Sequence, residues 1–297
     1  MINRRVSLQF PLTVREAYQE ASSFLQTIGI EDYLFEAELC IRRLLGVDRS
    51  RFFVMLSDRW PGEKSDQLVS WLDRRQQGEP LQYILGEQSF FGRTFYVDQN
   101  VLIPRPETEL LIEAVIHKTK QKWADRSIHV VDVGTGSGAI AITLALECPH
   151  WHVTAIDVSK AALETAQKNA RYHHIEDQIT WIHGEYLSPL IEQKREFEVL
   201  VSNPPYIPTA TIAGLEKQVR AYEPTLALDG GIDGLNPYRT LIKQLSQFRE
   251  PKVIGFEIGH DQGRAVAELI QTTQSHAEVE VQKDLAGHDR VILVGLD

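Results

Sequence analysis

The chain has 297 residues, of which 43% are hydrophobic and 24% are charged, and its net charge at pH 7 is −10. This length is typical of about two globular domains, and the acidic charge argues against a protein that grips duplex DNA through a large basic surface. The two cysteines, Cys40 and Cys148, are too few and too far apart for a disulfide framework or a cysteine metal site, so we expect a reducing, cytoplasmic location and no metal.

No segment is typical of export or of membrane insertion. The N-terminal stretch Met1–Val14 mixes polar and apolar residues, so we expect that it is not a signal peptide. The most continuous apolar stretch, Ala139–Leu146, is much shorter than the ~20 residues that cross a bilayer. We therefore expect a protein that does not bind membranes. We also expect it to be a monomer.

The first part of the chain, residues 1–80, is expected to be a small helical domain. Apolar residues recur at helical spacing over Val14–Ile28, Tyr33–Leu45 and Ser65–Arg75. Thr13 is a suitable N-cap for the first helix, and Gly29 is a suitable stop.

A linker is expected over residues 81–103. The stretch Gln76–Gly86 is expected to be the junction, because the preceding helical segment ends before Gly78 and Pro80. After it, Ser89–Val97 is typical of two short strands around the turn at Gly92. We predict a β-hairpin between two domains.

From Ile103 onward, short β-rich strands alternate with helical stretches. The expected strands are Ile128–Val133, His152–Ile156, Gln178–Ile182, Phe197–Val201 and Val253–Ile258. This alternation predicts an α/β domain over residues 104–297, with a mostly parallel sheet covered by helices. The last strands, Ala277–Lys283 and Arg290–Val294, are joined by a short loop and are expected to form an antiparallel edge.

A glycine-rich loop follows the first of these strands and opens a helix. Its candidate binding residues are Asp132, Gly134, Thr135, Gly136, Ser137 and Gly138. Glycines let the backbone turn tightly and approach a ligand. Asp157 ends the next strand, where a carboxylate can accept hydrogen bonds from both hydroxyls of a ribose.

Two nucleoside cofactors compete for this loop, and a purely structural strand-to-helix turn is the alternative to both. A nicotinamide dinucleotide usually requires G-x-G-x-x-G, whereas the spacing here is G-T-G-S-G. S-adenosylmethionine has no phosphate, and its amino-acid tail and sulfonium suit an acidic strand end such as Asp132. The spacing therefore favours S-adenosylmethionine, with S-adenosylhomocysteine as the product.

The tetrapeptide Asn203-Pro204-Pro205-Tyr206 follows the fourth strand, where ligands bind in open α/β sheets. The prolines stiffen the loop and leave its carbonyls free. A rigid turn without function is the alternative. The Asn203 side-chain oxygen and the Pro204 carbonyl can each accept an N–H of a planar NH₂ group, and Tyr206 can stack on that plane.

These features predict a methyltransferase that acts on an amide-like nitrogen. Such a nitrogen is a poor nucleophile because its lone pair is delocalised, so orientation is the main requirement. Once methylated it is acidic enough to release its proton to water. We therefore do not expect a catalytic role for the histidines, including His174, His183, His260 and His288.

Taken together, the motifs resemble those of the HemK/PrmC family, the release factor glutamine methyltransferases. The resemblance spans nearly the whole chain. Besides the glycine loop and Asn203–Tyr206, it rests on Tyr83–Gly86, Val101–Glu109, Glu223–Pro224, Ala227–Gly231, Phe256–Gly259 and Asp284–Val291. The Asn-Pro-Pro-Tyr element alone is shared with adenine N6 methyltransferases, whereas its combination with Arg105–Glu109 is more specific.

The resemblance implies a Rossmann-like S-adenosylmethionine-dependent fold and a substrate, the glutamine of the Gly-Gly-Gln motif in peptide-chain release factors, methylated at N5. It implies that Gly134–Gly138, Asp157 and Asn203 contact the cofactor and that Asn203–Tyr206 hold the glutamine. It places Glu185 and Tyr186 near the adenine, although the family more often has aspartate at the position of Glu185.

Other parts of the resemblance have structural as well as functional interpretations. Pro106, Glu107 and Glu109 suit a helix start, and an added role of the same segment in roofing the site is the functional interpretation. Gly230, Gly231 and Gly234 are expected to be turn residues. The N-terminal helices are either a stabilising appendage or a docking module for release factor. An N6-adenine nucleic-acid methyltransferase and a non-catalytic cofactor-binding module are the alternative functions.

Overall fold

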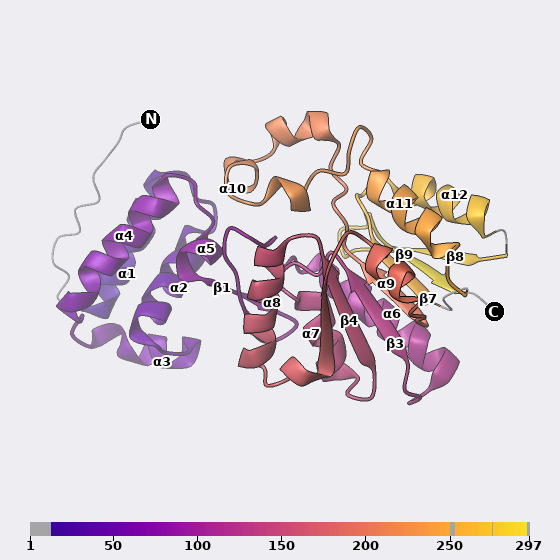
Figure 1. Cartoon of the computed structure of the whole chain (residues 1–297). Helices are drawn as coiled ribbons and strands as arrows, with labels where there is room; N and C mark the ends of the chain where they lie inside the picture. The colour runs from indigo at the N-terminus through magenta and orange to yellow at the C-terminus, as the bar shows by residue number, and fades with distance from the viewer. Residues whose placement is uncertain (1–12, 250–252, 275, 296–297) are drawn as a thin grey trace. The chain divides into compact units, whose positions relative to one another are not determined.

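The computed structural model describes residues 13–249, 253–274 and 276–295 (Figure 1). The chain divides into two compact units, Met1–Gly86 and Glu87–Asp297. Residues 1–12, which hold most of the segment that we expect not to be a signal peptide, lie outside the described residues. Within the described ranges, no helix combines the length and the apolar character that a membrane crossing requires.

The first unit is helical. Its helices are α1 (Val14–Thr27), α2 (Tyr33–Leu45), α3 (Arg49–Val54), α4 (Ser65–Gln76) and α5 (Leu81–Leu85). Thr13 caps α1 as predicted, because its hydroxyl accepts from Glu16 N while the Glu16 carboxylate accepts from Thr13 N. The apolar faces meet in one core that includes Leu25, Ile41 and Leu68. The three longest helices confirm the expected helical region.

A two-stranded hairpin opens the second unit. Strands β1 (Glu87–Phe90) and β2 (Arg93–Tyr96) pair antiparallel. Phe91 and Gly92 form the turn with φ of 50° and 69°, which is the geometry of a tight hairpin turn. The segment predicted as a linker is thus divided: α5 packs into the helical core, whereas Phe90 and Phe95 of the hairpin pack into the core of the second unit.

The second unit is built around a seven-stranded sheet. Its strands are β3 (His129–Val133), β4 (His152–Asp157), β5 (Ile179–His183), β6 (Val199–Ser202), β7 (Val253–Glu257), β8 (Glu278–Lys283) and β9 (Asp289–Gly295). Their spatial order is β5-β4-β3-β6-β7-β9-β8. The first five are parallel, and β9 pairs antiparallel with both β7 and β8. The predicted parallel sheet and antiparallel edge are confirmed.

Helices cover both faces of this sheet, which gives three layers. One face packs against α6 (Glu107–Trp123), α7 (Ala139–Glu147) and α8 (Lys160–Tyr172), and the other against α9 (Ser188–Gln193), α11 (Asn236–Leu245) and α12 (Gly263–Thr273). Successive side chains of a strand point to opposite faces, so Val130 joins the first core and Val131 the second. Strands buried on both faces explain the continuous apolar runs of the sequence.

The strand order places a crevice at β3. The chain runs outward through β3, β4 and β5, and then returns to β6 on the other side of β3. Ligands of open α/β sheets bind at such a reversal, outside the carboxyl ends of the strands.

Candidate active site

A cavity of about 260 Å³ lies at this reversal, entirely within the second unit. One part of its wall comes from the ends of four strands and the loops that follow them. These residues are Val133–Ser137, Ile156–Ser159, Gly184–Tyr186 and Ser202–Pro205. A second part of the wall comes from the segment before α6 and its first turn, which contributes Arg105 and Thr108. The cavity thus gathers the glycine loop, the acidic strand end and the Asn-Pro-Pro corner.

The glycine loop is held in a conformation that favours glycine. Gly134, Gly136 and Gly138 have φ of 74°, 55° and 81°. Gly134 N donates to the carbonyl of Ile156 at 2.8 Å, which ties the loop to β4. A Cβ at Gly134 or Gly136 would meet no atom within 4 Å, so the space beside these two backbones is open.

Asp132 lies behind the loop and is not part of the cavity wall. Its side chain is fully buried, and Oδ2 accepts from Thr135 Oγ1 at 2.6 Å and from Ala141 N at 3.2 Å. Burial raises the pKa of this carboxyl to about 7, although both hydrogen bonds oppose the shift. Through Oδ2, Asp132 braces the loop against α7, whereas its Oδ1 is buried without a hydrogen-bond partner among the described residues. The predicted contact of Asp132 with the cofactor stays a prediction.

Asp157, in contrast, lies at the cavity wall. Its Oδ2 accepts from Gly136 N and its Oδ1 from Ser159 N, each at 2.8 Å. Burial raises its pKa, and these backbone N–H groups counteract the shift. The two bonds fix the carboxylate, and its remaining lone pairs can accept from the two hydroxyls of a ribose.

The loop after β5 supplies Glu185 and Tyr186 to the same wall. Gly184 N donates to the carbonyl of Asp157 at 3.0 Å, so this loop is tied to the end of β4. A Cβ at Gly184 would lie 2.2 Å from Cγ of Pro189, which leaves room only for glycine. Tyr186 is half-buried against the second core. Both residues therefore line the cavity, and their contact with an adenine stays a prediction.

Asn203, Pro204 and Pro205 line the cavity, but Tyr206 does not. The corner begins with Ser202, whose hydroxyl donates to the carbonyl of Val133 at 2.6 Å and so holds β6 to β3. Tyr206 packs against the second core, and burial raises its pKa to about 12. Its predicted stacking on the substrate stays a prediction. Among the described residues that form the wall there is no histidine.

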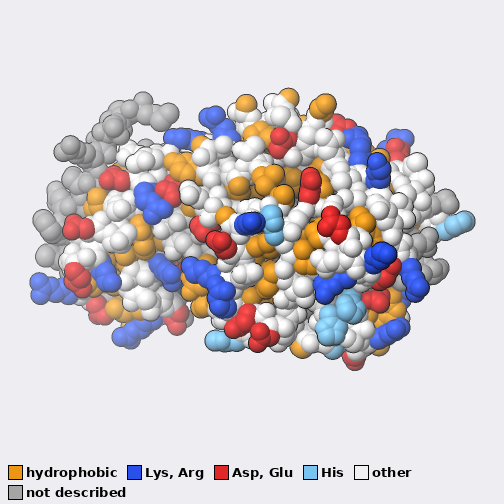
Figure 2. Space-filling view, viewed as in Figure 1, with side chains coloured by type: hydrophobic (Ala, Val, Ile, Leu, Met, Phe, Trp, Pro, Cys, Tyr) orange, Lys and Arg blue, Asp and Glu red, His pale blue; other side chains and the backbone are white. Residues whose placement is uncertain are grey.

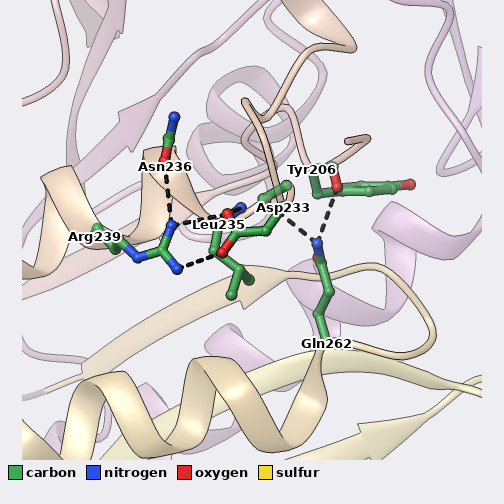
Figure 3. A network of polar contacts seen from close by, with 7 residues as sticks. Tyr206, Asp233, Leu235, Asn236, Arg239 and Gln262 are labelled. Atoms are coloured by element: carbon green, nitrogen blue, oxygen red, sulfur yellow. Dashed lines mark hydrogen bonds and ion pairs between the residues drawn. The ribbon is translucent and has the colours of Figure 1, made fainter. Parts of the chain in front are cut away.

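A network behind Tyr206 anchors the far end of this corner (Figure 3). The Gln262 side-chain amide donates to the carbonyls of Tyr206 and Gly234, at 3.0 and 3.3 Å. Asp233 pairs with Arg239 of α11, so the turn that contains Gly234 is fixed on both sides. Gly230, Gly231 and Gly234 do not line the cavity, in keeping with their expected role as turn residues.

Gly234→Ala should break the hydrogen bonds of this network and destabilise the protein. Gly234 has a φ of 76°, and a Cβ there would lie 2.2 Å from the Tyr206 carbonyl oxygen. Because that atom belongs to the backbone, we expect the free energy of unfolding to fall by about 2 kcal/mol or more, with a loss of activity. Chemical denaturation of Gly287→Ala is the control: φ is 84° there, but no atom lies within 4 Å. Equal losses in the two variants would contradict the role of the network.

Comparisons with known proteins show the family of the chain. Residues 16–86 match the model of the PrmC N-terminal domain, and residues 106–219 match that of the methyltransferase small domain. The release factor glutamine methyltransferase of Bacillus anthracis is 39% identical over 96% of this chain and 100% of its own length. The protein of the same name from Bacillus subtilis (strain 168) is 40% identical over 94% of this chain and 96% of its own.

Solved structures support the fold alone, since their identities are low. The hMettl16 catalytic domain, solved with a MAT2A 3'UTR hairpin, has a TM-score of 0.54 at 16% identity and covers 78% of this chain and 83% of its own. The N-terminal domain of human METTL16 in complex with SAH has a TM-score of 0.50 at 16% identity, and the match covers 70% of this chain and 77% of that one. On the matches to both of its parts and the near-full-length identity, the chain belongs to the family of release factor glutamine methyltransferases.

Proposed function

We propose that this enzyme transfers the methyl group of S-adenosylmethionine to N5 of the glutamine in the Gly-Gly-Gln motif of peptide-chain release factors. One observation carries the proposal: the Asn203 corner and the glycine loop with Asp157 line the same cavity. A cofactor site and a holder for a planar NH₂ group are thereby adjacent. The sites of the cofactor and the substrate within the cavity are part of the proposal.

The residues present fit the cofactor. The Asp157 carboxylate suits a ribose diol, the open space beside Gly134 and Gly136 suits the amino-acid tail, and Tyr186 suits the flat face of adenine. When bound, S-adenosylmethionine supplies a methyl group on a positively charged sulfur.

The protein then has to orient the nitrogen. Asn203 Oδ1 and the Pro204 carbonyl accept the two N–H groups of the substrate amide, which points the nitrogen lone pair along the cavity toward the methyl group. As positive charge develops on that nitrogen, the two oxygens stabilise it. On transfer the substrate nitrogen would gain the methyl group, S-adenosylhomocysteine would leave, and the alkylated nitrogen would release its proton to water.

Labelled S-adenosylmethionine offered with release factor, an isolated Gly-Gly-Gln peptide or DNA tests this proposal. We expect label in release factor. Label in DNA but not in release factor would instead support the N6-adenine alternative. The charge argues against that outcome: the net charge is −10, and on the face shown in Figure 2 Lys and Arg side chains are interspersed with Asp and Glu.

We also propose that the helical first unit docks the release factor. It exposes large apolar side chains on α2 and α3, among them Phe35 and Phe53, which are 53% and 52% exposed. Action on release factors would place the enzyme in the cytoplasm, and its monomeric state stays a prediction.

A double variant, Phe35→Ser with Phe53→Ser, tests the docking role. Its KM for intact release factor should rise about tenfold, because buried aromatic anchors carry much of the binding energy of an interface. Its KM for a Gly-Gly-Gln peptide, which has no surface to dock, should not change. Leu285→Ser, at a fully exposed apolar residue of the second unit, is the control. Equal KM values for release factor in both variants would contradict docking by the first unit.

A further inference from the structure

Two family motifs without an assigned chemical role meet behind the Asn203 corner. Thr108 lies in the first turn of α6, within the Arg105–Glu109 segment, and Glu257 ends β7, within Phe256–Gly259. Thr108 Oγ1 donates to Glu257 Oε2 at 2.6 Å. Both residues are buried, with exposed fractions of 4% and 1%. Thr108 is the one described residue whose side chain donates to this carboxylate, and a buried carboxylate with so few donors is costly to retain for packing alone.

The same hydroxyl also contacts Asn203. Thr108 Oγ1 accepts from Asn203 Nδ2 at 3.2 Å, and Thr108 lines the cavity. A threonine hydroxyl has one proton, and here that proton is given to Glu257. Toward Asn203 the hydroxyl can therefore only accept, so the NH₂ group of the Asn203 amide must face Thr108. The Asn203 oxygen is then on the other side of the amide, where none of the described residues donates to it.

We propose that Thr108 and Glu257 are positioning residues that hold the Asn203 amide in one of its two orientations, with Oδ1 available to the substrate nitrogen. The inference rests on the proposed function, because only an NH₂ substrate needs an acceptor at that place. In the opposite orientation the Asn203 NH₂ would face the substrate NH₂, two donors would oppose each other, and the nitrogen would not be held.

The direction of the hydrogen bonds depends on the charge of Glu257. Ionised Glu257 accepts from Thr108, whereas a protonated Glu257 can donate to Thr108 and free the threonine proton to point at Asn203, which favours the flipped amide. Burial raises the pKa of Glu257 to about 7, and the Thr108 hydrogen bond and the charge of Arg290 counteract it. We call the two hydrogen bonds, from Asn203 Nδ2 to Thr108 Oγ1 and from Thr108 Oγ1 to Glu257 Oε2, the relay. The relay should hold Asn203 Oδ1 toward the substrate above about pH 7 and should fail to do so below it.

Several other groups face Glu257. Arg290 comes from β9, Arg105 and Glu107 from the start of α6 and the segment before it, Tyr206 from the loop after β6, and Tyr238 from α11. The tyrosine pKa values are raised by burial, and both rings stay neutral near pH 7. Asp132 also has a pKa of about 7. The test must therefore compare variants at each pH and cannot use the wild-type pH profile alone.

The experiment compares Thr108→Val, Thr108→Ser and Thr119→Val with wild type. Valine keeps the shape of threonine and removes the hydroxyl, and serine keeps the hydroxyl. Thr119 is the matched control, because it lies buried on the same helix and its hydroxyl has no hydrogen-bond partner among the described residues. The measurements are kcat and KM with release factor, the Kd of S-adenosylhomocysteine and the melting temperature, at pH 6 and pH 8.5.

At pH 8.5 we expect Thr108→Val to lower kcat about tenfold, with KM and Kd unchanged, and Thr108→Ser to restore most of the rate. Thr119→Val should match wild type. At pH 6 the ratio of the wild-type rate to the Thr108→Val rate should approach one. Provided that the wild-type enzyme is active, any of three results would overturn the relay. They are a Thr108→Val rate equal to that of Thr119→Val, a Thr108→Ser rate as low as that of Thr108→Val, and a wild-type to Thr108→Val rate ratio that does not change with pH. A wild-type protein inactive toward release factor would overturn the proposed function and the relay with it.

Discussion

Asn203→Ala should lower the rate of methyl transfer about 10²–10³-fold, which is the typical loss when one preorganised polar group at a reacting centre is removed. Asn203 lines the cavity, and its oxygen is the acceptor that we assign to the substrate NH₂ group. Alanine removes this acceptor and leaves the two prolines that shape the corner. Single-turnover rates with release factor and saturating S-adenosylmethionine measure the effect.

Binding of the cofactor separates a chemical defect from a collapsed site. The Kd of S-adenosylhomocysteine for Asn203→Ala should rise far less than the rate falls, since the cofactor contact that the resemblance implies for Asn203 is one of several, and Gly136 and Asp157 hold each other in place. The melting temperature should also be close to that of wild type. Full activity in the alanine variant would show that another group orients the nitrogen.

Asp157→Ala should weaken S-adenosylmethionine binding by about 100-fold. The carboxylate provides the acceptors for the ribose, and hydrogen bonds to a charged group contribute about 1.5–3 kcal/mol each. Its loss also leaves Gly136 N and Ser159 N without the acceptors they have at 2.8 Å, so the loop loses its fixed conformation. Isothermal titration with the cofactor measures the effect directly.

Asp157→Ala should change the affinity for S-adenosylmethionine more than the rate of methyl transfer. At saturating S-adenosylmethionine, the rate of Asp157→Ala should approach that of wild type, since the Asn203 corner is intact. Glu164→Ala, which removes an exposed carboxylate from the adjacent helix α8, controls for the change in net charge. A cofactor affinity equal in the two variants would contradict a role for Asp157 in the site.

The layers of the fold were predictable because their signals are local. Val14–Thr27 shows helical spacing and a cap, and β3 shows an apolar run before a glycine. The short helices α3 and α5 were not predicted, since one or two turns give too few residues for a period to show. The same holds for the 3₁₀ helix Thr209–Gly214 and for α10 (Lys217–Arg220), which lie between β6 and β7.

The sequence predicted which loops form the candidate site, but it did not predict which of their side chains contact one another or line the cavity. The motifs indicate which strand ends meet, and Gly134, Asp157 and Asn203 do share one cavity. The same motifs do not tell which side chains form its wall: Asp132 lies behind the wall residue Thr135, and Tyr206 packs against the second core.

The Thr108–Glu257 hydrogen bond joins residues 149 positions apart. No periodicity or spacing links two such positions. Their contact depends on how α6 packs against β7, which is a property of the folded core. The fold brings the two motifs together behind Asn203.

Mass spectrometry of the Gly-Gly-Gln fragment of release factor, treated with S-adenosylmethionine in the presence and absence of the enzyme, tests the central claim most directly. We expect one added methyl group, which fragmentation assigns to the side-chain amide nitrogen of the glutamine, and little or no addition with Asn203→Ala over the same reaction time. A methyl group on any other residue, or an unmodified fragment from a protein that binds the cofactor, would contradict it.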